Sequence, residues 1–368
     1  MFVHGLNGDP HNTWTAEKSK IFWPAQLLPL ILEEEKARIL VYGYDADVTS
    51  FTDGASRDKI HNHAEHLIAE LAANRRIRKP TERPIIFVAH SLGGLVVKRA
   101  LIYSSEIRGN YTEHLRSVFV SIYGILFLGT PHKGSDLAAW GSRLEAICSA
   151  VIPSRVVDSH DALVKALKTN NETLQNIDRQ FIQLISRFHV YFFHEGKPTK
   201  LAHTTAFVVD EDSASPTIQD VERAVIQADH SHMCKFESDS SSGFDLVAEG
   251  IQRYAGEAPT VIASRWDSEH AERIAKKKAE IEEILPGESR SQAFHQRKWQ
   301  HSGYDFRGQR TSHHLGAEIL QLKGSVEVSV FRLPNMLSAI SARNGFTSAP
   351  EASHSADRTP PTATSSEI

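Results

Sequence analysis

A buried strand that runs directly into a serine turn and then into a helix constrains this sequence more than any other feature. Residues Ile85–Ala89 form a continuous apolar run, and a helical pattern starts directly after Ser91. A serine in this strand–turn–helix context is typical of a nucleophile elbow, whose sharp turn exposes the hydroxyl group. The turn needs small residues two positions before and two positions after the serine, and Ala89 and Gly93 meet that requirement. Ser91 is therefore the candidate nucleophile, at the N-terminus of a helix that stabilises negative charge.

Short apolar runs alternate with helical patterns along residues 1–256. Because the runs are continuous and do not alternate with polar residues, they indicate strands buried on both faces, as in a parallel sheet. Such an order predicts a doubly wound, mostly parallel α/β domain with its ligand site at the carboxyl ends of the strands. The expected strands are Phe2–His4, Ile39–Tyr44, Ile85–Ala89, Gly124–Leu128, Val190–Phe193 and Ala206–Val209. The expected helices are Trp23–Lys36, Asp58–Ile77, Leu92–Tyr103, Leu137–Ile152, Ala162–Phe188 and Phe244–Tyr254.

A different texture begins after residue 256. Residues 257–285 predict a charged helix or a linker. Residues 286–368 have no sustained period and end in a segment rich in Pro, Ser, Thr and Ala, which predicts a largely disordered tail. We therefore expect residues 1–256 to fold without the rest of the chain.

Composition and charge exclude several classes of function. The chain carries 41 Lys and Arg against 45 Asp and Glu, a formal net charge of −4, so we expect no nucleic-acid partner. No apolar run approaches the roughly 18 residues of a membrane-spanning helix, and no secretory signal begins the chain, so we expect an intracellular, cytosolic protein. The cysteines and the histidines of the tail lack the spacing of zinc ligands, so we expect neither a metal nor a cofactor. These residues are Cys148, Cys234, His295, His301, His313 and His314.

An acyl-transfer serine needs hydrogen-bond donors for the oxyanion that forms during the reaction. The loop Val3–Gly8 leaves the first expected strand, and Gly5 and Gly8 allow its backbone N–H groups to converge. We assign the two donors to the backbone N–H groups of Leu6 and Leu92.

The serine also needs a base and an orienting acid, in the chain order Ser, acid, His. Acidic residues Asp210–Asp212 end the expected strand Ala206–Val209, and a polar loop with two histidines follows at Ala228–Phe236. A second polar turn follows the expected strand Gly124–Leu128, where its residues either join the catalytic group or shape the pocket and cap the next helix. The alternatives that the residues leave open are His230, His232 and His132 for the base, and Asp212, Glu211 and Asp136 for the acid.

Four separated motifs resemble those of the lipase-like α/β-hydrolases. They are Val3–Gly8, Ala89–Gly94, Phe127–Gly134 and Asp229–Phe236. The resemblance covers about residues 1–256 and is closest to the branch of serine active site containing protein 1 and the GPI inositol-deacylase, and to the N-terminal lipase-like modules of fungal NOD-like receptor proteins. It implies an α/β-hydrolase fold and a serine hydrolase that cleaves a carboxylic ester of a lipid or GPI-like substrate without a cofactor.

The resemblance also implies roles for individual residues. It makes Ser91 the nucleophile, His230 the base because an acidic residue precedes it and Met-Cys-Lys follows, and Asp212 the acid because Ser-Ala follows it. The neighbouring His4, Gly5 and His90 are expected secondary site residues. Two departures from the family pattern are the alanine in place of the first elbow glycine and a first strand that is short.

The resemblance leaves two functions and two structural interpretations open. Relatives of this type associate with mitochondrial or endoplasmic-reticulum membranes, which implies peripheral membrane contact, or act in cytosolic immune signalling. The alternative to an ester hydrolase is therefore a signalling or interaction module with weak or regulatory hydrolase activity and unknown protein partners. The stretches Leu137–Ile152 and Ala162–Phe188 form either a helical lid, as a lipid substrate would require, or ordinary crossover helices.

Overall fold

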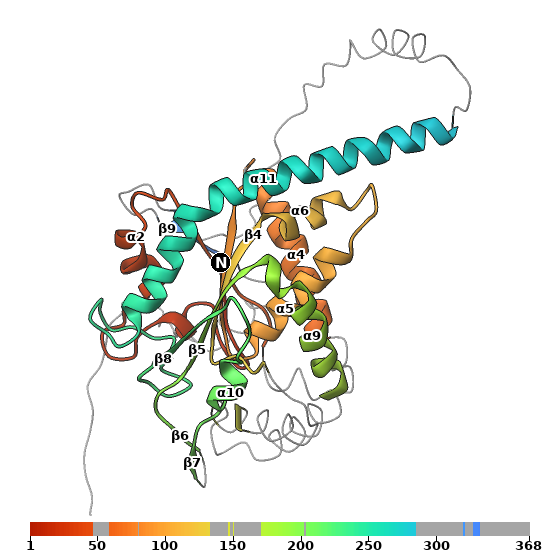
Figure 1. Cartoon of the computed structure of the whole chain (residues 1–368). Coiled ribbons are helices and arrows are strands. Elements are labelled where there is room, and N and C mark those ends of the chain that lie inside the picture. Colours follow the sequence, from red (N-terminus) through yellow and green to blue (C-terminus); the bar gives the residue numbers. More distant parts are fainter. Residues whose placement is uncertain are drawn as a thin grey trace, which may run out of the picture. The chain divides into compact units, whose positions relative to one another are not determined.

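The computed structural model describes residues 1–46, 59–79, 81–132, 146–147, 150, 171–201, 204–284, 319–320 and 327–331. At the centre lies an eight-stranded sheet in the order β8-β5-β4-β3-β1-β2-β10-β9 (Figure 1). The strands are β1 (Phe2–Val3), β2 (Arg38–Tyr42), β3 (Ile85–His90), β4 (Ile122–Leu128), β5 (His189–Glu195), β8 (Glu222–Ile226), β9 (Ile319–Leu320) and β10 (Glu327–Phe331). All neighbouring pairs are parallel except β9 with β10, which confirms the predicted mostly parallel α/β domain.

Helices cover both faces of the sheet (Figure 1). They are α1 (Trp23–Gln26), α2 (Leu28–Ile31), α4 (Lys59–Ile77), α5 (Gly93–Glu106), α6 (Glu113–Ser121), α9 (Asn171–Leu184), α10 (Glu211–Ala214) and α11 (Phe244–Ile284). One apolar core joins the sheet to α4, α5 and α9, and the other joins it to α1, α2 and α11. The neighbours Phe87 and Val88 of β3 enter opposite cores, because successive side chains of a strand point to opposite faces. Burial on both faces therefore explains the continuous apolar runs.

Two elements next to the site differ from the sequence-based expectation. The expected strand Ala206–Val209 is not part of the large sheet: β7 (Thr205–Ala206) pairs antiparallel with β6 (Thr199–Lys200) in a separate hairpin. The large sheet instead continues from β5 to β8, which the sequence analysis missed. Side chains of β8 are mostly exposed or half-buried, because among the described strands it lies at the sheet edge, so it lacks a continuous apolar run.

The helix α11 is continuous over 41 residues, where two separate helices were expected. It passes through Gly256 and Pro259, although a proline inside a helix costs about 3 kcal/mol. Beyond the proline, Ile262 and Trp266 are buried in the core. Arg265 donates to the carbonyl oxygens of Ile122, the first residue of β4, and of Arg187, which lies two residues before β5. This packing offsets the cost of the proline, so the expected boundary at residue 256 falls inside a helix.

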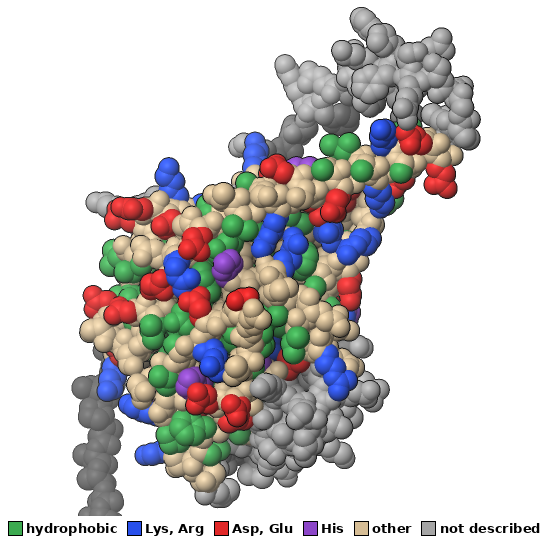
Figure 2. Space-filling view, in the orientation of Figure 1, with side chains coloured by type: hydrophobic (Ala, Val, Ile, Leu, Met, Phe, Trp, Pro, Cys, Tyr) green, Lys and Arg blue, Asp and Glu red, His purple; other side chains and the backbone are tan. Residues whose placement is uncertain are grey.

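The last part of α11 is the charged helix that the sequence predicted. Figure 2 shows side chains of both signs interspersed along the part of α11 that extends from the domain. Ile274 and Ile281 are exposed there, and Lys276 lies 3.9 Å from Glu280. The range 286–368, expected to be disordered, supplies strands β9 and β10, and β10 pairs with β2 over five residues.

Removing residues 257–284 is expected to destabilise the domain strongly. Relative to a chain that ends at Ile284, a chain that ends at Gly256 loses the buried side chains of Ile262 and Trp266. We expect the free energy of unfolding to fall by about 5 kcal/mol, since deletion of such side chains typically costs 2–5 kcal/mol each. Urea unfolding of the two truncated chains measures this difference. Equal midpoints would show that α11 beyond Gly256 contributes no stability.

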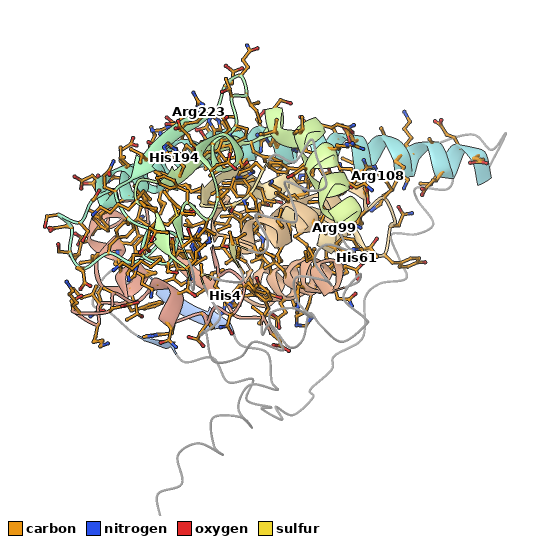
Figure 3. The ribbon with its side chains drawn as sticks, turned by 90° about the horizontal axis from the view of Figure 1, so that it is seen from below. His4, His61, Arg99, Arg108, His194 and Arg223 are labelled. Carbon is orange, nitrogen blue, oxygen red and sulfur yellow. The ribbon has the colours of Figure 1, made fainter. Side chains whose placement is uncertain are left out.

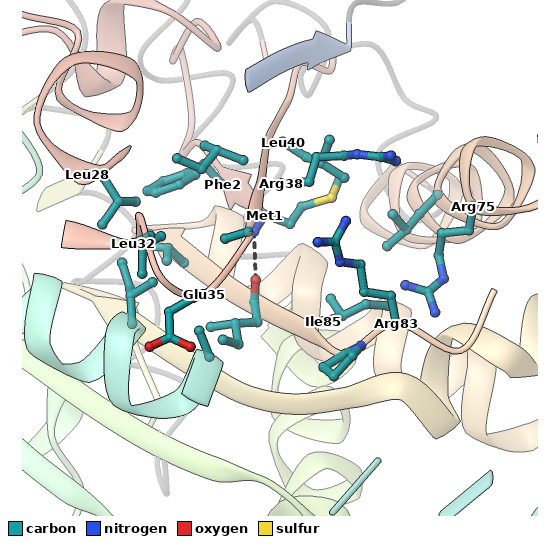
Figure 4. A pocket seen from close by; sticks show the side chains of 18 of the residues that line it. Met1, Phe2, Leu28, Leu32, Glu35, Arg38, Leu40, Arg75, Arg83 and Ile85 are labelled. Carbon is teal, nitrogen blue, oxygen red and sulfur yellow. Dashed lines mark hydrogen bonds between the residues drawn. The ribbon is translucent and has the colours of Figure 1, made fainter. Parts of the chain in front are cut away.

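A cavity of about 170 Å³ lies at the end of the sheet away from Ser91 (Figure 4). Its lining includes Met1, Arg38 and Ile85, which stand at the starting ends of β1, β2 and β3. The strand β1 has only two residues, and these pair with the later residues of β2 and β3. No residue of β1 therefore lies between the first residues of β2 and β3. The Met1 amino group donates to the Ile86 carbonyl at 2.6 Å, and burial lowers its pKa to about 5. This cavity therefore belongs to the packing of the short strand.

Candidate active site

Ser91 follows β3 in the left-handed backbone conformation, with φ of 53°. For a residue other than glycine this conformation costs about 1–3 kcal/mol, and the surroundings must hold it. The Ser91 N–H donates to the Leu128 carbonyl at 2.9 Å, and the Gly94 N–H donates to the Ser91 carbonyl at 3.1 Å. The Thr130 hydroxyl donates to the same Ser91 carbonyl at 3.0 Å. The strand, the strained turn and the helix α5 therefore have the arrangement of a nucleophile elbow.

A hydrogen-bonded chain connects Ser91 to a histidine and a carboxylate. The distance from Ser91 Oγ to His230 Nε2 is 2.9 Å, and the distance from His230 Nδ1 to Glu195 Oε1 is 2.8 Å. All three side chains are buried. Because a carboxylate can only accept, His230 Nδ1 carries the proton, and Nε2 is left to accept from the Ser91 hydroxyl. The structure thus brings Ser91 and His230 together, as the sequence predicted.

The carboxylate beside His230 is Glu195, and the expectation that Asp212 takes this position is wrong. Asp212 lies in α10 and is exposed, whereas Glu195 is the last residue of β5. The expectation failed because Ala206–Val209 was treated as a late strand of the sheet. In the structure the end of that segment holds the carboxylate: the Val208 and Val209 N–H groups donate to Glu195 oxygens at 3.1 and 2.9 Å.

The other candidate acids and bases lie away from the Ser91 hydroxyl or outside the described residues. His232 is half-exposed, and its Nδ1 lies 2.6 Å from Asp229 Oδ1. The loop turns at this point, since the His232 N–H donates to the Asp229 carbonyl at 3.2 Å. Glu211 is exposed in the short helix α10, which Asp210 caps by accepting from the Ser213 N–H at 3.0 Å. Asp136, most of the lid candidate Leu137–Ile152 and the first nine residues of the lid candidate Ala162–Phe188 lie outside the described residues. The described part of the second candidate includes α9, whose Ile177 and Phe181 are buried in the core.

His132 is buried and packs its ring against two phenylalanines. Its ring centroid lies 4.7 Å from that of Phe127 and 4.4 Å from that of Phe192. Burial, together with the nearby Lys98 ammonium, keeps the pKa of His132 well below its usual range. His132 therefore packs in the apolar core beside β4 and β5 and is not part of the hydrogen-bonded chain of Ser91, His230 and Glu195.

The loop after β1 lies directly against the nucleophile. A Cβ atom at Gly5 would stand 2.8 Å from Ser91 Cβ, and one at Gly93 would stand 2.2 Å from a carbonyl oxygen of this loop, so neither position has room for a side chain. Within the described part of the chain, the backbone N–H groups of Leu6 and Leu92 donate to no backbone acceptor. Both are therefore available to an oxygen bound next to Ser91, as an oxyanion hole requires.

His4 fixes the backbone of the same loop. His4, labelled in Figure 3, is buried. Its Nδ1 donates to the Gly5 carbonyl at 3.0 Å, and its Nε2 accepts from the Tyr44 N–H at 3.3 Å. The Tyr44 hydroxyl in turn donates to the His4 carbonyl at 2.9 Å. Burial lowers the pKa of His4 to about 4, so the ring stays neutral and keeps this tautomer at neutral pH.

Sequence reasoning missed three residues that support the site. Glu195 was overlooked although it lies two residues after the end of the predicted strand Val190–Phe193, and carboxylates that follow other predicted strands were considered as the acid. The preceding residue His194 is on the opposite face of the strand, because successive side chains alternate, and its Nδ1 lies 3.2 Å from Ser215 Oγ. Thr130, which supports the elbow, lies in the motif Phe127–Gly134 but was given no role there. Thr199, which accepts from the His230 N–H, gave no signal because single hydroxyl residues are common throughout the chain.

Buried neutral groups predict that the domain loses stability on mild acidification. Burial lowers the pKa of His4 to about 4, that of His90 to about 3 and that of the Met1 amino group to about 5, and it also lowers the pKa of His132. Because the unfolded chain binds these protons first, stability is complete above the unfolded pKa values, about 6.5 for the histidines and about 8 for the amino group. It is lost as pH falls towards the folded values, by about 1.4 kcal/mol per group and pH unit.

Urea unfolding between pH 7.5 and 5 measures this loss. We expect His132→Phe to reduce the pH slope by one proton, because the ring packs among phenylalanines and its replacement no longer titrates. Unfolding midpoints that do not change between pH 7.5 and 5 would contradict the prediction.

Neither metal ligation nor membrane crossing is indicated by the described side chains. In that part of the chain, no three His, Cys, Asp or Glu residues are grouped to hold a metal ion. None of the helices described combines the length and the apolarity needed to cross a membrane.

Comparison with known proteins agrees with this geometry. Residues 1–146 match the family described as "Putative serine esterase (DUF676)". Over these residues the chain is similar to serine esterases. It is similar to Protein SERAC1 of Danio rerio, with 26% identity over 277 residues that cover 70% of this chain and 39% of that protein. It is also similar to Protein SERAC1 of Homo sapiens, with 26% identity over 254 residues that cover 64% of this chain and 36% of that protein.

The chain spans well under half the length of these curated relatives. Among solved structures it aligns with the mature form of the Bacillus licheniformis lipase BlEst2, with a TM-score of 0.36 and 16% identity over 69% of this chain and 90% of that one. A hydrolase from Oleispira antarctica aligns with a TM-score of 0.36 and 12% identity over 68% of this chain and 89% of that one.

Proposed function

We propose that this serine hydrolase cleaves carboxylic esters through a triad of Ser91, His230 and Glu195. The observation that carries the proposal is the hydrogen-bonded chain from Ser91 Oγ through the His230 ring to the Glu195 carboxylate, at 2.9 and 2.8 Å. A buried histidine between a serine hydroxyl and a carboxylate is the arrangement that activates a serine as a nucleophile.

The chemistry follows from the protonation states of this chain. His230 Nε2 takes the proton of Ser91 as Oγ attacks the ester carbonyl carbon, and Glu195 stabilises the imidazolium that forms. The N–H groups of Leu6 and Leu92 bind the oxyanion of the tetrahedral intermediate. Collapse of the intermediate expels the alcohol, which takes the proton from His230, and leaves an acyl group on Ser91. Water, deprotonated by His230, then hydrolyses the acyl-enzyme.

We extend the proposal to lipid esters, including GPI-like substrates, on the basis of the motif resemblance. A series of p-nitrophenyl esters of increasing acyl length tests the extension. We expect kcat/KM to rise with chain length, and a preference for acetyl over longer chains would argue against a lipid substrate.

A fluorophosphonate probe tests the proposal against a module without hydrolase activity. Such a probe labels a serine only when a base has activated its hydroxyl group. We expect labelling of the whole chain at Ser91, with peptide mapping to locate the adduct. Absence of labelling on folded protein would favour the signalling or interaction alternative.

A further inference from the structure

Both peptide groups of His230 are held by side chains from distant parts of the chain. The His230 N–H donates to Thr199 Oγ1 at 3.2 Å, and the His230 carbonyl lies 2.9 Å from His90 Nε2. Thr199 and His90 are buried, so these bonds form away from solvent. The contacts join β6 and the end of β3 to the loop that carries the histidine.

The state of His90 is determined by its surroundings. A carbonyl oxygen can only accept, so His90 Nε2 carries the proton and donates. Its ring lies edge-on to Trp14, with centroids 6.5 Å apart and an interplanar angle of 76°. Burial lowers the pKa of His90 to about 3, so the ring is a neutral donor at neutral pH. Because His90 directly precedes Ser91, the donor is attached rigidly to the nucleophile turn.

The hairpin of β6 and β7 contacts both partners of Ser91. Thr199 at its start accepts from the His230 N–H, and the Val208 and Val209 N–H groups just after it donate to the Glu195 carboxylate. The base and the acid are therefore positioned against each other by one short segment of backbone.

We propose that His90 and Thr199 are positioning residues, which clamp the peptide groups of His230 and thereby set its ring between Ser91 and Glu195. The inference rests on the proposed triad. His230 lies in a loop, so its ring position depends on where its backbone is held, and a misplacement of about 1 Å can cost on the order of 10²-fold in rate. Neither residue contacts the reacting atoms, and each acts through His230.

Paired substitutions test the clamp. His90→Phe removes the donor but keeps an aromatic ring, whereas His90→Gln keeps an N–H near the position of Nε2. Thr199→Val removes the acceptor at nearly constant volume, whereas Thr199→Ser keeps it. We expect kcat on a short ester to fall about 10- to 100-fold in His90→Phe and Thr199→Val, with KM within about twofold of the parent. His90→Gln and Thr199→Ser should recover most of the parental kcat.

A spectroscopic measurement makes the test independent of turnover. The low-field proton resonance of the His230 Nδ1–H bound to Glu195 should broaden or vanish in His90→Phe and Thr199→Val, and remain in His90→Gln and Thr199→Ser. A merely structural role would lower the melting temperature and leave both kcat per folded molecule and this resonance unchanged, which would overturn the proposal. If His90→Phe does not fold, the Thr199 pair alone decides between these outcomes.

Failure of the clamp and failure of the triad give different results. If Ser91→Ala and His230→Ala are inactive but His90→Phe and Thr199→Val match the parent in kcat, the clamp is wrong and the triad stands. If Ser91→Ala keeps parental activity, the triad itself is wrong, whatever the His90 and Thr199 variants do. If the clamp and the triad are both correct, His90→Phe should cause no further loss of kcat in a chain that already carries His230→Ala, because His90 acts through His230.

Discussion

Replacement of Ser91 by alanine is expected to reduce ester turnover by a factor on the order of 10⁶, because residues that act as a triad lose nearly all their effect together. Ser91→Ala removes the hydroxyl that lies 2.9 Å from His230 Nε2 and leaves the rest of the elbow in place. Initial rates on a short p-nitrophenyl ester measure the loss, and the fluorophosphonate label should disappear in the same variant.

The matched control for this change is Ser231→Ala, in the loop directly after His230. It removes a serine hydroxyl close to the site in sequence but outside the hydrogen-bonded chain, so activity should stay within about twofold of the parent. Hydrolysis by Ser91→Ala within tenfold of the parent would exclude Ser91 as the nucleophile.

Replacement of Glu195 by glutamine is expected to reduce kcat by on the order of 10⁴, the size of effect that follows loss of the orienting carboxylate. The carboxylate accepts from His230 Nδ1 at 2.8 Å and so leaves Nε2 unprotonated for the Ser91 hydroxyl. A glutamine can present its amide N–H to Nδ1, which favours the wrong tautomer of the ring. Glu195→Gln should therefore keep KM and lose kcat.

Asp212→Asn is the discriminating comparison. Asp212 is exposed in α10, away from the hydrogen-bonded chain, so this variant should retain at least half of the parental kcat. Glu211→Gln should behave in the same way. A greater loss in Asp212→Asn than in Glu195→Gln would restore the assignment that the resemblance implies and would contradict the geometry.

The parts of the site that the sequence predicted are those set by neighbouring residues. The elbow depends on a buried strand, a turn with small residues beside Ser91, and a helix, all within Ile85–Lys98. The pairing of Ser91 with His230 came from motif resemblance, and the structure brings these two residues together. The chain order Ser, acid, His also holds, with a different acid.

The acid could not be predicted because its identity depends on which strands join the large sheet. The edge strand β8 has an exposed face, so it carries little apolar signal, whereas Val208 and Val209 read as a strand. The side chains of those valines are buried in the apolar core, and their backbone N–H groups donate to the Glu195 carboxylate. An apolar run in the sequence indicates that its residues are buried. It does not show whether they form a strand of the sheet or a segment outside the sheet that binds a buried carboxylate.

The sequence by itself determined the parallel sheet and the nucleophile turn, because continuous apolar runs and small residues around a serine act over short distances along the chain. Only the tertiary structure decided the acid, the clamp on His230 and the length of α11. In each case the physical reason is a contact between residues that are distant in the sequence. Glu195 contacts His230, which lies 35 positions later, and His90 contacts the same histidine across 140 positions. Likewise, α11 continues through Pro259 because Ile262 and Trp266 bury their side chains in the core formed with the sheet.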